Sequence, residues 1–172
     1  MAQPLSHRSS GGGSTIFNSV DDQLWDSVTN RDLHGVLSAL RRGADVNMIC
    51  SDGFVREEMA AKKRGIGRSL LHHAAWVGDL EIFKLLVEQG GDVTRKRNTA
   101  WRPNGGVRGR GATPLHHACM YGRKDIVKYL IDDAGAEVNE PGEQGYTALH
   151  IAVKFNCELL PLFQSYCYSL PR

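Results

Sequence analysis

The chain has 172 residues, and its 21 lysine and arginine residues nearly balance its 19 aspartate and glutamate residues, which gives a formal net charge of +2. This length allows one domain with a real core or a short repeat array, and the charge alone indicates no polyanionic partner. No apolar stretch approaches the roughly 20 residues that span a bilayer, and no apolar run follows a basic start, so neither a membrane span nor a secretory leader is expected.

The four cysteines lie at positions 50, 119, 157 and 167 and form no C-x-x-C pair. Such scattered cysteines favour a reducing compartment over a disulfide scaffold. We therefore expect a cytoplasmic protein, and a basic segment in the middle of the chain is also compatible with nuclear import.

The N-terminal third divides into a tail, a helical unit and an insert. Residues 1–20 are rich in glycine and serine, so we expect a disordered tail. Residues 21–47, which include "QLWDSVTNRDLHGVLSALRRGADVN", repeat more loosely the pattern of the units that follow, so we expect a first repeat unit here. Residues 48–67 follow as an insert, in which Glu58 and Lys62 form an i,i+4 pair in the favoured order and predict a short helix.

Two closely similar units follow. "RSLLHHAAWVGDLEIFKLLVEQGGDVT" in residues 68–94 aligns with "GATPLHHACMYGRKDIVKYLIDDAGAEVN" in residues 111–139 almost residue for residue, and a basic insert at 95–110 separates them. "GYTALHIAVKFN" then repeats the first half, so residues 140–172 are expected to form a fourth unit with an irregular C-terminus. Self-similarity of this kind indicates a repeat solenoid.

The third unit shows why each repeat folds as two helices. Thr113 is a good N-cap and Pro114 suits the first helical position. His116 lies three residues after Thr113, where its ring can reach back to the cap as in a capping box. Gly122 can end the first helix because glycine adopts a positive φ freely. The apolar residues of "DIVKYLI" then share one face of a second helix, and that face must stack on neighbouring units to be buried.

The motifs "TPLHHA", "TALHIA" and "GADVN" make the chain resemble the ankyrin-repeat family, whose repeat has about 33 residues. The resemblance covers roughly residues 21–156, and it implies an all-α ankyrin-like solenoid of about four helix-turn-helix units with extended turns and two long inserts. Trp25 replaces the motif histidine and Arg31 the glycine in the first unit, as expected of an end cap. The resemblance implies a non-catalytic protein-protein interaction module or adaptor without a cofactor.

The repeated histidines are expected to be structural. We assign a structural role to Thr113, His72, His116 and His150. His73 and His117 share the next position, where Ile151 in the last unit marks a packing site. A zinc site would need four converging ligands or three with a water, whereas helix spacings of roughly 8–10 Å keep equivalent residues apart. With no paired carboxylates, nucleophile elbow or complete phosphate loop, we expect neither a metal site nor an enzyme.

Function is expected on the concave surface made by the first helices and the turns. The two residues before each helix-ending glycine position should project toward it, and aromatic and flexible apolar residues, which are typical of binding hot spots, are enriched there. The predicted partner-binding residues are Trp76, Val77, Met120, Tyr121, Lys154 and Phe155, bordered by Glu143, Gln144 and Tyr146. The sequence leaves open that some of these side chains, above all Phe155, fold into the core instead.

The basic insert at 95–110 supports an alternative function. It holds six basic residues and no acid, and "KKR" of the earlier insert is expected near it on an adjacent turn. The candidate anion-binding residues are Lys62, Lys63, Arg64, Arg95, Lys96, Arg97, Trp101, Arg102, Arg108 and Arg110. They could contact nucleic acid or another polyanion, although inserts in repeat proteins also occur simply as solvated loops.

The fourth unit loses the repeat pattern after Asn156. Pro161 falls inside the expected second helix, where proline removes a hydrogen bond and clashes with the preceding turn. We therefore expect the last helix to be short, displaced or frayed, and we expect weak self-association through its uncovered apolar side chains. These are Leu159, Leu160, Leu162, Phe163 and Tyr166.

Overall fold

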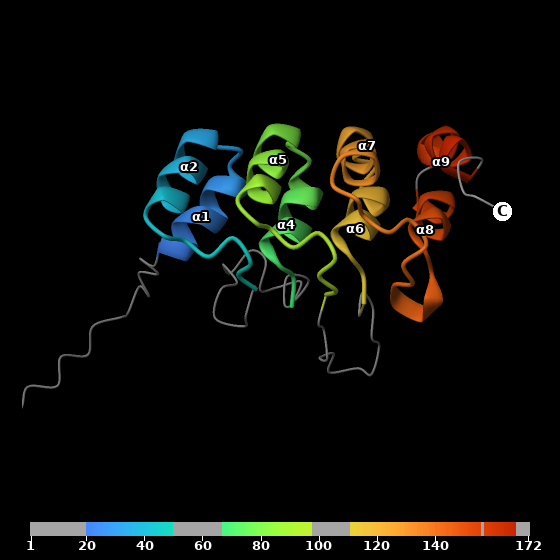
Figure 1. The fold of residues 1–172 in the computed structure, drawn as a ribbon, viewed down its shortest axis with the longest axis horizontal. Coiled ribbons are helices and arrows are strands. Elements are labelled where there is room, and N and C mark those ends of the chain that lie inside the picture. Colours follow the sequence, from blue (N-terminus) through green and yellow to red (C-terminus); the bar gives the residue numbers. More distant parts are fainter. Residues whose placement is uncertain (1–19, 50–66, 98–110, 156, 168–172) are drawn as a thin grey trace, which may run out of the picture.

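The computed structural model describes residues 20–49, 67–97, 111–155 and 157–167, in which four helix pairs stack side by side in chain order (Figure 1). The first helices of the pairs, here called inner helices, are α1 (Val20–Thr29), α4 (Leu70–Val77), α6 (Pro114–Met120) and α8 (Ala148–Phe155). The second, or outer, helices are α2 (Leu33–Arg41), α5 (Leu80–Glu88), α7 (Lys124–Asp132) and α9 (Leu160–Cys167). We number the pairs as units 1 to 4. This part of the chain is an all-helical repeat solenoid, as the sequence predicts.

Some predictions concern residues outside these ranges. They are the tail up to residue 19, the helix expected around Glu58 and Lys62, and most of both inserts. Within the described ranges, none of the helices has the length and apolar character that crossing a membrane requires.

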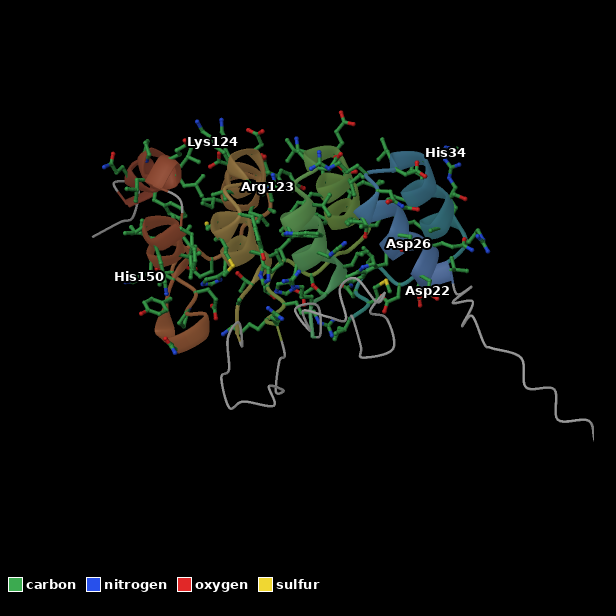
Figure 2. All side chains as sticks on the ribbon, turned by 180° about the vertical axis from the view of Figure 1, so that it is seen from behind. Asp22, Asp26, His34, Arg123, Lys124 and His150 are labelled. Atoms are coloured by element: carbon green, nitrogen blue, oxygen red, sulfur yellow. The ribbon has the colours of Figure 1, made fainter. Side chains whose placement is uncertain are left out.

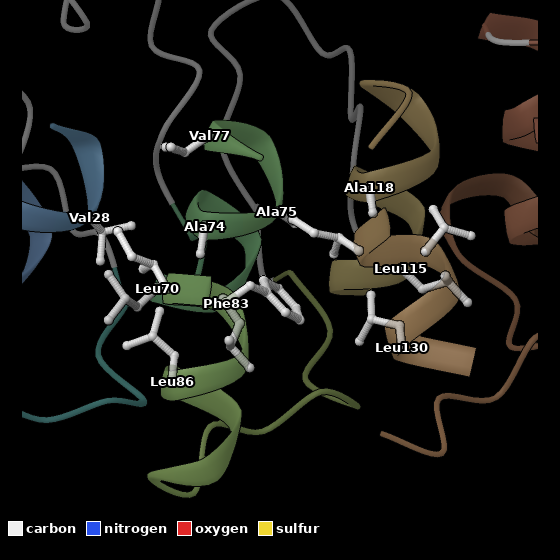
Figure 3. Close-up of a cluster of buried hydrophobic side chains, with 14 of the residues drawn as sticks. Val28, Leu70, Ala74, Ala75, Val77, Phe83, Leu86, Leu115, Ala118 and Leu130 are labelled. Atoms are coloured by element: carbon white, nitrogen blue, oxygen red, sulfur yellow. The ribbon is translucent and has the colours of Figure 1, made fainter. Parts of the chain in front are cut away.

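The core follows the row of units. Leu24, Leu71 and Leu115 occupy equivalent positions on the inner helices and are almost completely buried. Figure 3 shows this core with Phe83 of α5 and Leu130 of α7, which close it from the outer helices. Burying one such side chain contributes about 1.5–3 kcal/mol, so the stacking of units supplies much of the stability of the array.

The turns between units lie along one edge of the array, next to the N-terminal ends of the inner helices (Figure 1). Ile49 and Ser69 form an isolated antiparallel bridge, and the Arg97 N–H donates to the Ala112 carbonyl at 2.8 Å. These contacts join the two ends of each insert. Both inserts therefore start from short hairpin stems on the same edge, which we call the hairpin edge.

The last helix differs from the sequence-based expectation. Helix α9 starts at Leu160, so Pro161 occupies its first turn, where a proline breaks no intrahelical hydrogen bond. Leu159 and Phe163 are almost fully buried against the unit, while Leu160 and Leu162 are half-buried. Of the three alternatives expected for this helix, the structure shows displacement, because the 3-10 turn Cys157–Leu159 moves the helix start onto the proline. The expectation that Leu159 and Phe163 are uncovered was wrong, and the side chain of Tyr166 lies outside the described part of the chain.

Candidate partner-binding surface

The C-terminal ends of α4 and α6 place two aromatic side chains next to each other. Trp76 is half-buried and Tyr121 is 37 % exposed, and their ring centroids lie 6.4 Å apart in an edge-to-face arrangement. Half-buried Met120 packs against the core beside them. We call Trp76, Met120 and Tyr121 the aromatic surface. Rings that are anchored at one side and open at the other are typical of binding hot spots.

Side chains of units 1 and 2 pack in a row that ends at Trp76. The His73 ring stacks on Trp25 of α1 at 4.3 Å and lies 5.3 Å from the Trp76 ring. The Thr29 hydroxyl donates to the Trp25 carbonyl at 2.8 Å, so its oxygen is free to accept the proton of His73 Nε2, also at 2.8 Å. Burial lowers the pKa of His73 to about 3, which keeps this ring neutral. Trp76 is thus preorganised, which reduces the entropy lost on binding.

Val77 does not belong to this surface, and its prediction as a partner-binding residue was wrong. Only 7 % of Val77 is exposed, and its side chain is part of the buried core cluster. Val77 is still part of α4, where successive side chains point about 100° apart, so it faces away from Trp76, whereas Tyr121 at the equivalent position follows the last residue of α6. The prediction treated two consecutive residues as one surface.

Two arginines from the neighbouring units hold the end of α4. Arg31 of unit 1, in a left-handed conformation with φ 57°, donates through Nη2 to the Val77 carbonyl at 2.8 Å. Arg123 of unit 3 donates through Nε and Nη2 to the Trp76 carbonyl at 3.2 and 2.9 Å. A Cβ atom at Gly78 would lie 2.4 Å from Arg123 Nε, so the glycine makes room for this guanidinium. The arginines satisfy helix-end carbonyls and complement the negative end of the helix dipole.

The sequence reasoning missed the role of Arg123. At the equivalent positions, Asp32 and Asp79 accept from the N–H groups of Gly35 and Ile82 and cap α2 and α5. An arginine side chain cannot accept such a bond, so its presence in unit 3 marks a residue with another role. Figure 2 shows Arg123 at the start of α7. Aligning the units position by position would have singled it out.

Unit 4 carries a second exposed group. Phe155, whose burial the sequence left open, is 53 % exposed, and Tyr146 is exposed as well. Lys154 Nζ lies 5.6 Å from the Tyr146 ring centroid and 5.4 Å from that of Phe155, within the range of cation-π contacts. Gln144 is exposed at the turn with φ 57°, and Glu143 belongs to the same turn. The structure thus brings Tyr146, Lys154 and Phe155 together on one unit.

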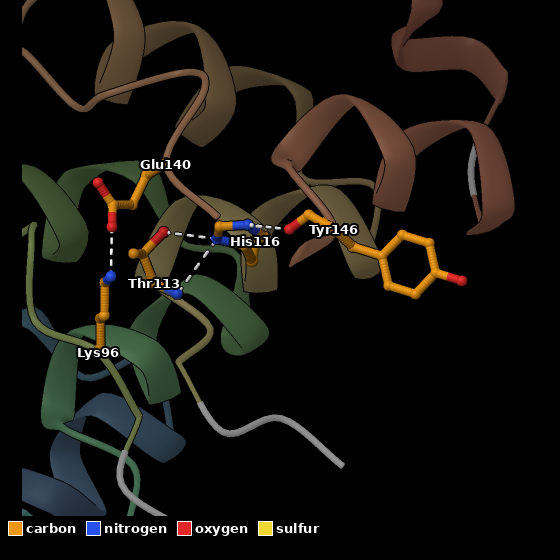
Figure 4. A network of polar contacts seen from close by, with 5 residues as sticks. All are labelled: Lys96, Thr113, His116, Glu140 and Tyr146. Atoms are coloured by element: carbon orange, nitrogen blue, oxygen red, sulfur yellow. Dashed lines mark hydrogen bonds and ion pairs between the residues drawn. The ribbon is translucent and has the colours of Figure 1, made fainter. Parts of the chain in front are cut away.

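The repeated histidines link each helix cap to the next unit (Figure 4). The N–H and the hydroxyl of Thr113 lie 3.2 and 2.8 Å from His116 Nδ1. An N–H can only donate, so Nδ1 accepts and the ring proton is on Nε2, which donates to the Tyr146 carbonyl at 3.0 Å. His72 Nε2 makes the same contact with the Ala112 carbonyl at 2.7 Å. Burial lowers the pKa of His116 and lowers that of His72 to about 4.

His150 makes only the first half of this arrangement. The Thr147 N–H and hydroxyl lie 3.2 and 2.8 Å from its Nδ1, but no described residue accepts from its Nε2. Figure 2 shows His150 on the last inner helix, at the end of the row. Leu149 is half-buried and Val153 is 53 % exposed, although the equivalent side chains of α4 and α6 are buried. We call His150, Leu149 and Val153 the open face of α8.

The buried histidines and the buried thiol have properties of a packed core. His72 and His117 meet edge to face at 4.9 Å across units 2 and 3, and burial lowers the pKa of both. Burial also raises the pKa of Cys119 to about 12, so this thiol is a poor nucleophile near neutral pH. Among the residues that the structure describes, no three or more histidine, cysteine or acidic side chains are placed to hold a metal ion.

Three of the predicted anion-binding residues are described. Arg95 Nη1 donates to the Asn47 carbonyl at 3.4 Å, Lys96 forms an ion pair with Glu140 (Figure 4), and Arg97 is half-buried. Arg95 and Lys96 therefore each have a partner within the described part of the protein. The other candidates, Lys62, Lys63, Arg64, Trp101, Arg102, Arg108 and Arg110, lie outside the described residues.

Comparison with known proteins gives one family. The family model for ankyrin repeats, with three copies, matches residues 71–164. Comparison with curated proteins finds no match. The matched residues run from α4 into the first half of α9, where the repeat pattern of the sequence is no longer recognisable.

Proposed function

The chain belongs to the ankyrin-repeat family, whose repeats generally mediate protein-protein interactions, and we propose that it is a non-catalytic adaptor that binds a partner protein with the aromatic surface on the concave side of the array. The observation that carries this proposal is the edge-to-face pair of Trp76 and Tyr121 at the ends of α4 and α6. The scattered cysteines support a cytoplasmic location.

The geometry supports a surface that changes little on binding. Trp76 is fixed by His73 behind it and by Arg123 on its carbonyl. Tyr121 retains the exposed area that a partner can bury, and its hydroxyl offers a polar contact. Tyr146, Lys154 and Phe155 extend the available contact area at unit 4 and favour an acidic residue in the partner opposite Lys154.

The test is affinity capture of partner proteins followed by mass spectrometry. Trp76→Ala with Tyr121→Ala should abolish capture of the specific partner, while Lys128→Ala on the exposed side of outer helix α7 should not. Circular dichroism establishes that both variants keep the fold. Equal capture by the double variant and the native chain would refute binding through the aromatic surface.

A polyanion contact through the basic inserts is the alternative function. Affinity that depends on phosphate contacts falls steeply with salt concentration, whereas contact through aromatic rings depends on it weakly. Two results would favour the alternative. Binding of the partner would weaken steeply between low and physiological salt, and the Trp76→Ala, Tyr121→Ala variant would bind as tightly as the native chain.

We also propose that the open face of α8, rather than α9, mediates weak self-association. A second copy of the chain would cover side chains that are buried in the preceding units. Val153→Glu should leave the fold intact and shift the chain toward monomer, as measured by sedimentation equilibrium, whereas Lys128→Glu on α7 should not. A native chain that stays monomeric at high concentration would contradict the proposal.

A further inference from the structure

Arg68 is a buried charged residue at the hairpin edge. It lies between Gly67 and the N-cap residue Ser69, and only 8 % of its surface is exposed. Its Nε is buried without a hydrogen-bond partner, and the described part of the chain gives its guanidinium neither a hydrogen bond nor an ion pair. Arg123, in contrast, makes two hydrogen bonds to the Trp76 carbonyl.

The surroundings of Arg68 contain no compensating negative charge among the described residues. Its charge contributes to lowering the pKa values of His72, His73 and His117, so it lies within electrostatic range of three neutral rings. Arg97 acts on His72 and His117 in the same direction, which makes the region more positive. Within the ranges that the structure describes, no carboxylate is among the groups that act on these three histidines.

A buried guanidinium without a counter-charge destabilises a fold, because arginine keeps its proton and loses its hydration. A neutral side chain of similar length would pack at the same place without this cost. Protein sites that bind a ligand commonly retain such unfavourable groups, because the ligand compensates them.

The position of Arg68 relates it to the proposed binding surface. Within the repeat, Arg68 corresponds to Ala112 and to exposed Tyr146, which each precede the capping residue of their unit. His73, which is close enough to feel the Arg68 charge, contacts Trp76 of the aromatic surface. Arg68 and Trp76 lie at opposite ends of α4, so a partner must extend along this helix from the aromatic surface to the hairpin edge to contact both.

We propose that Arg68 is the anchor of a carboxylate-binding site that accepts an aspartate or glutamate side chain of the partner protein. This inference rests on the proposed function, because it assigns an acidic residue to that same partner. Because only 8 % of Arg68 is exposed, a group that contacts it must be small and carried at the end of a flexible side chain. A planar carboxylate fits a guanidinium through two parallel hydrogen bonds, whereas a nucleic-acid phosphate carries a sugar on each side.

The test combines the stability of the free protein with binding of a hexaglutamate peptide at constant physiological ionic strength. Arg68→Met should raise the melting temperature of the free chain and weaken hexaglutamate binding about thirtyfold, the loss expected when a buried charge pair loses one partner. Arg123→Met should lower the melting temperature, since its guanidinium has partners. Arg41→Met on the exposed end of α2 removes the same charge and should change neither quantity appreciably.

Arg68→Lys keeps the charge but loses the planar fork, so it should bind hexaglutamate more weakly than the native chain and more tightly than Arg68→Met. Three results would overturn the proposal: a lower melting temperature for Arg68→Met, unchanged hexaglutamate binding in that variant, or displacement of hexaglutamate by inorganic phosphate at similar concentration. These three results would leave the proposed role of the aromatic surface untouched. That role is tested separately, by partner capture with the Trp76→Ala, Tyr121→Ala variant.

Discussion

Lowering the pH should destabilise this array through its buried histidines. Burial lowers the pKa of His72 from 6.5 to about 4 and that of His73 to about 3, and it lowers the pKa of His117 well below 6.5. The unfolded chain therefore binds protons more readily than the folded chain. The stabilisation by neutral histidines is complete above pH 6.5 and is lost as the pH falls from there toward the folded pKa values.

The magnitude follows from the pKa difference. At about pH 5.5 an unfolded histidine is roughly nine-tenths protonated while folded His72 and His73 remain neutral, which costs about 1.4 kcal/mol per histidine relative to pH 7.5. These two histidines together lower the free energy of unfolding by about 3 kcal/mol, a large part of the 5–15 kcal/mol typical of a domain, and His117 acts in the same direction. Urea titrations followed by circular dichroism across this pH range measure the change.

A matched substitution isolates the effect. Ile151 already occupies the position of His73 and His117 in unit 4, so His117→Ile removes one titrating group and keeps an apolar side chain there. The free energy of unfolding of this variant should therefore fall less between pH 7.5 and 5.5 than that of the native chain. A free energy of unfolding that stays constant from pH 7.5 to 5.5, or an unchanged pH dependence in His117→Ile, would show that these rings are not buried in the neutral form.

Three substitutions test other contacts. Leu115→Ala should lower the free energy of unfolding by about 2–5 kcal/mol because Leu115 is almost fully buried between units, as urea denaturation can measure. Arg123→Met should cost about 1–3 kcal/mol through the lost bonds to the Trp76 carbonyl, and no loss would mean that water replaces this contact. Gly142→Ala should lower the free energy of unfolding by about 1–3 kcal/mol, because the added Cβ would lie 2.8 Å from His116 Nε2. If the effects of Gly142→Ala and His116→Ala simply add in a double-mutant cycle, this contact is not the cause.

Contacts within one unit could be predicted from the sequence, because they depend on short spacings. The Thr113–His116 cap is an example, since both partners lie within one helical turn. The start of α9 at Leu160 could not be predicted from the repeat, because a 3-10 turn that the other units lack shifts the helix onto Pro161.

Contacts between units were harder to predict. Arg123 reaches the Trp76 carbonyl 47 residues away, and Arg68 is buried although its residue type suggests exposure. The burial of Val77 could not be predicted either, because it depends on the direction of one side chain and not on the place of Val77 in the motif.

Site-specific photo-crosslinking tests the central claim most directly. A photoreactive phenylalanine analogue placed at Tyr121 should crosslink to a partner protein, and the same analogue placed at Lys128 on the outer helix α7 should not. Mass spectrometry of the crosslinked peptide identifies the contact. The proposal predicts a single partner segment that carries apolar residues and at least one acid, crosslinked from position 121 alone. Equal crosslinking from both positions, or crosslinking from 128 only, would contradict binding through the aromatic surface.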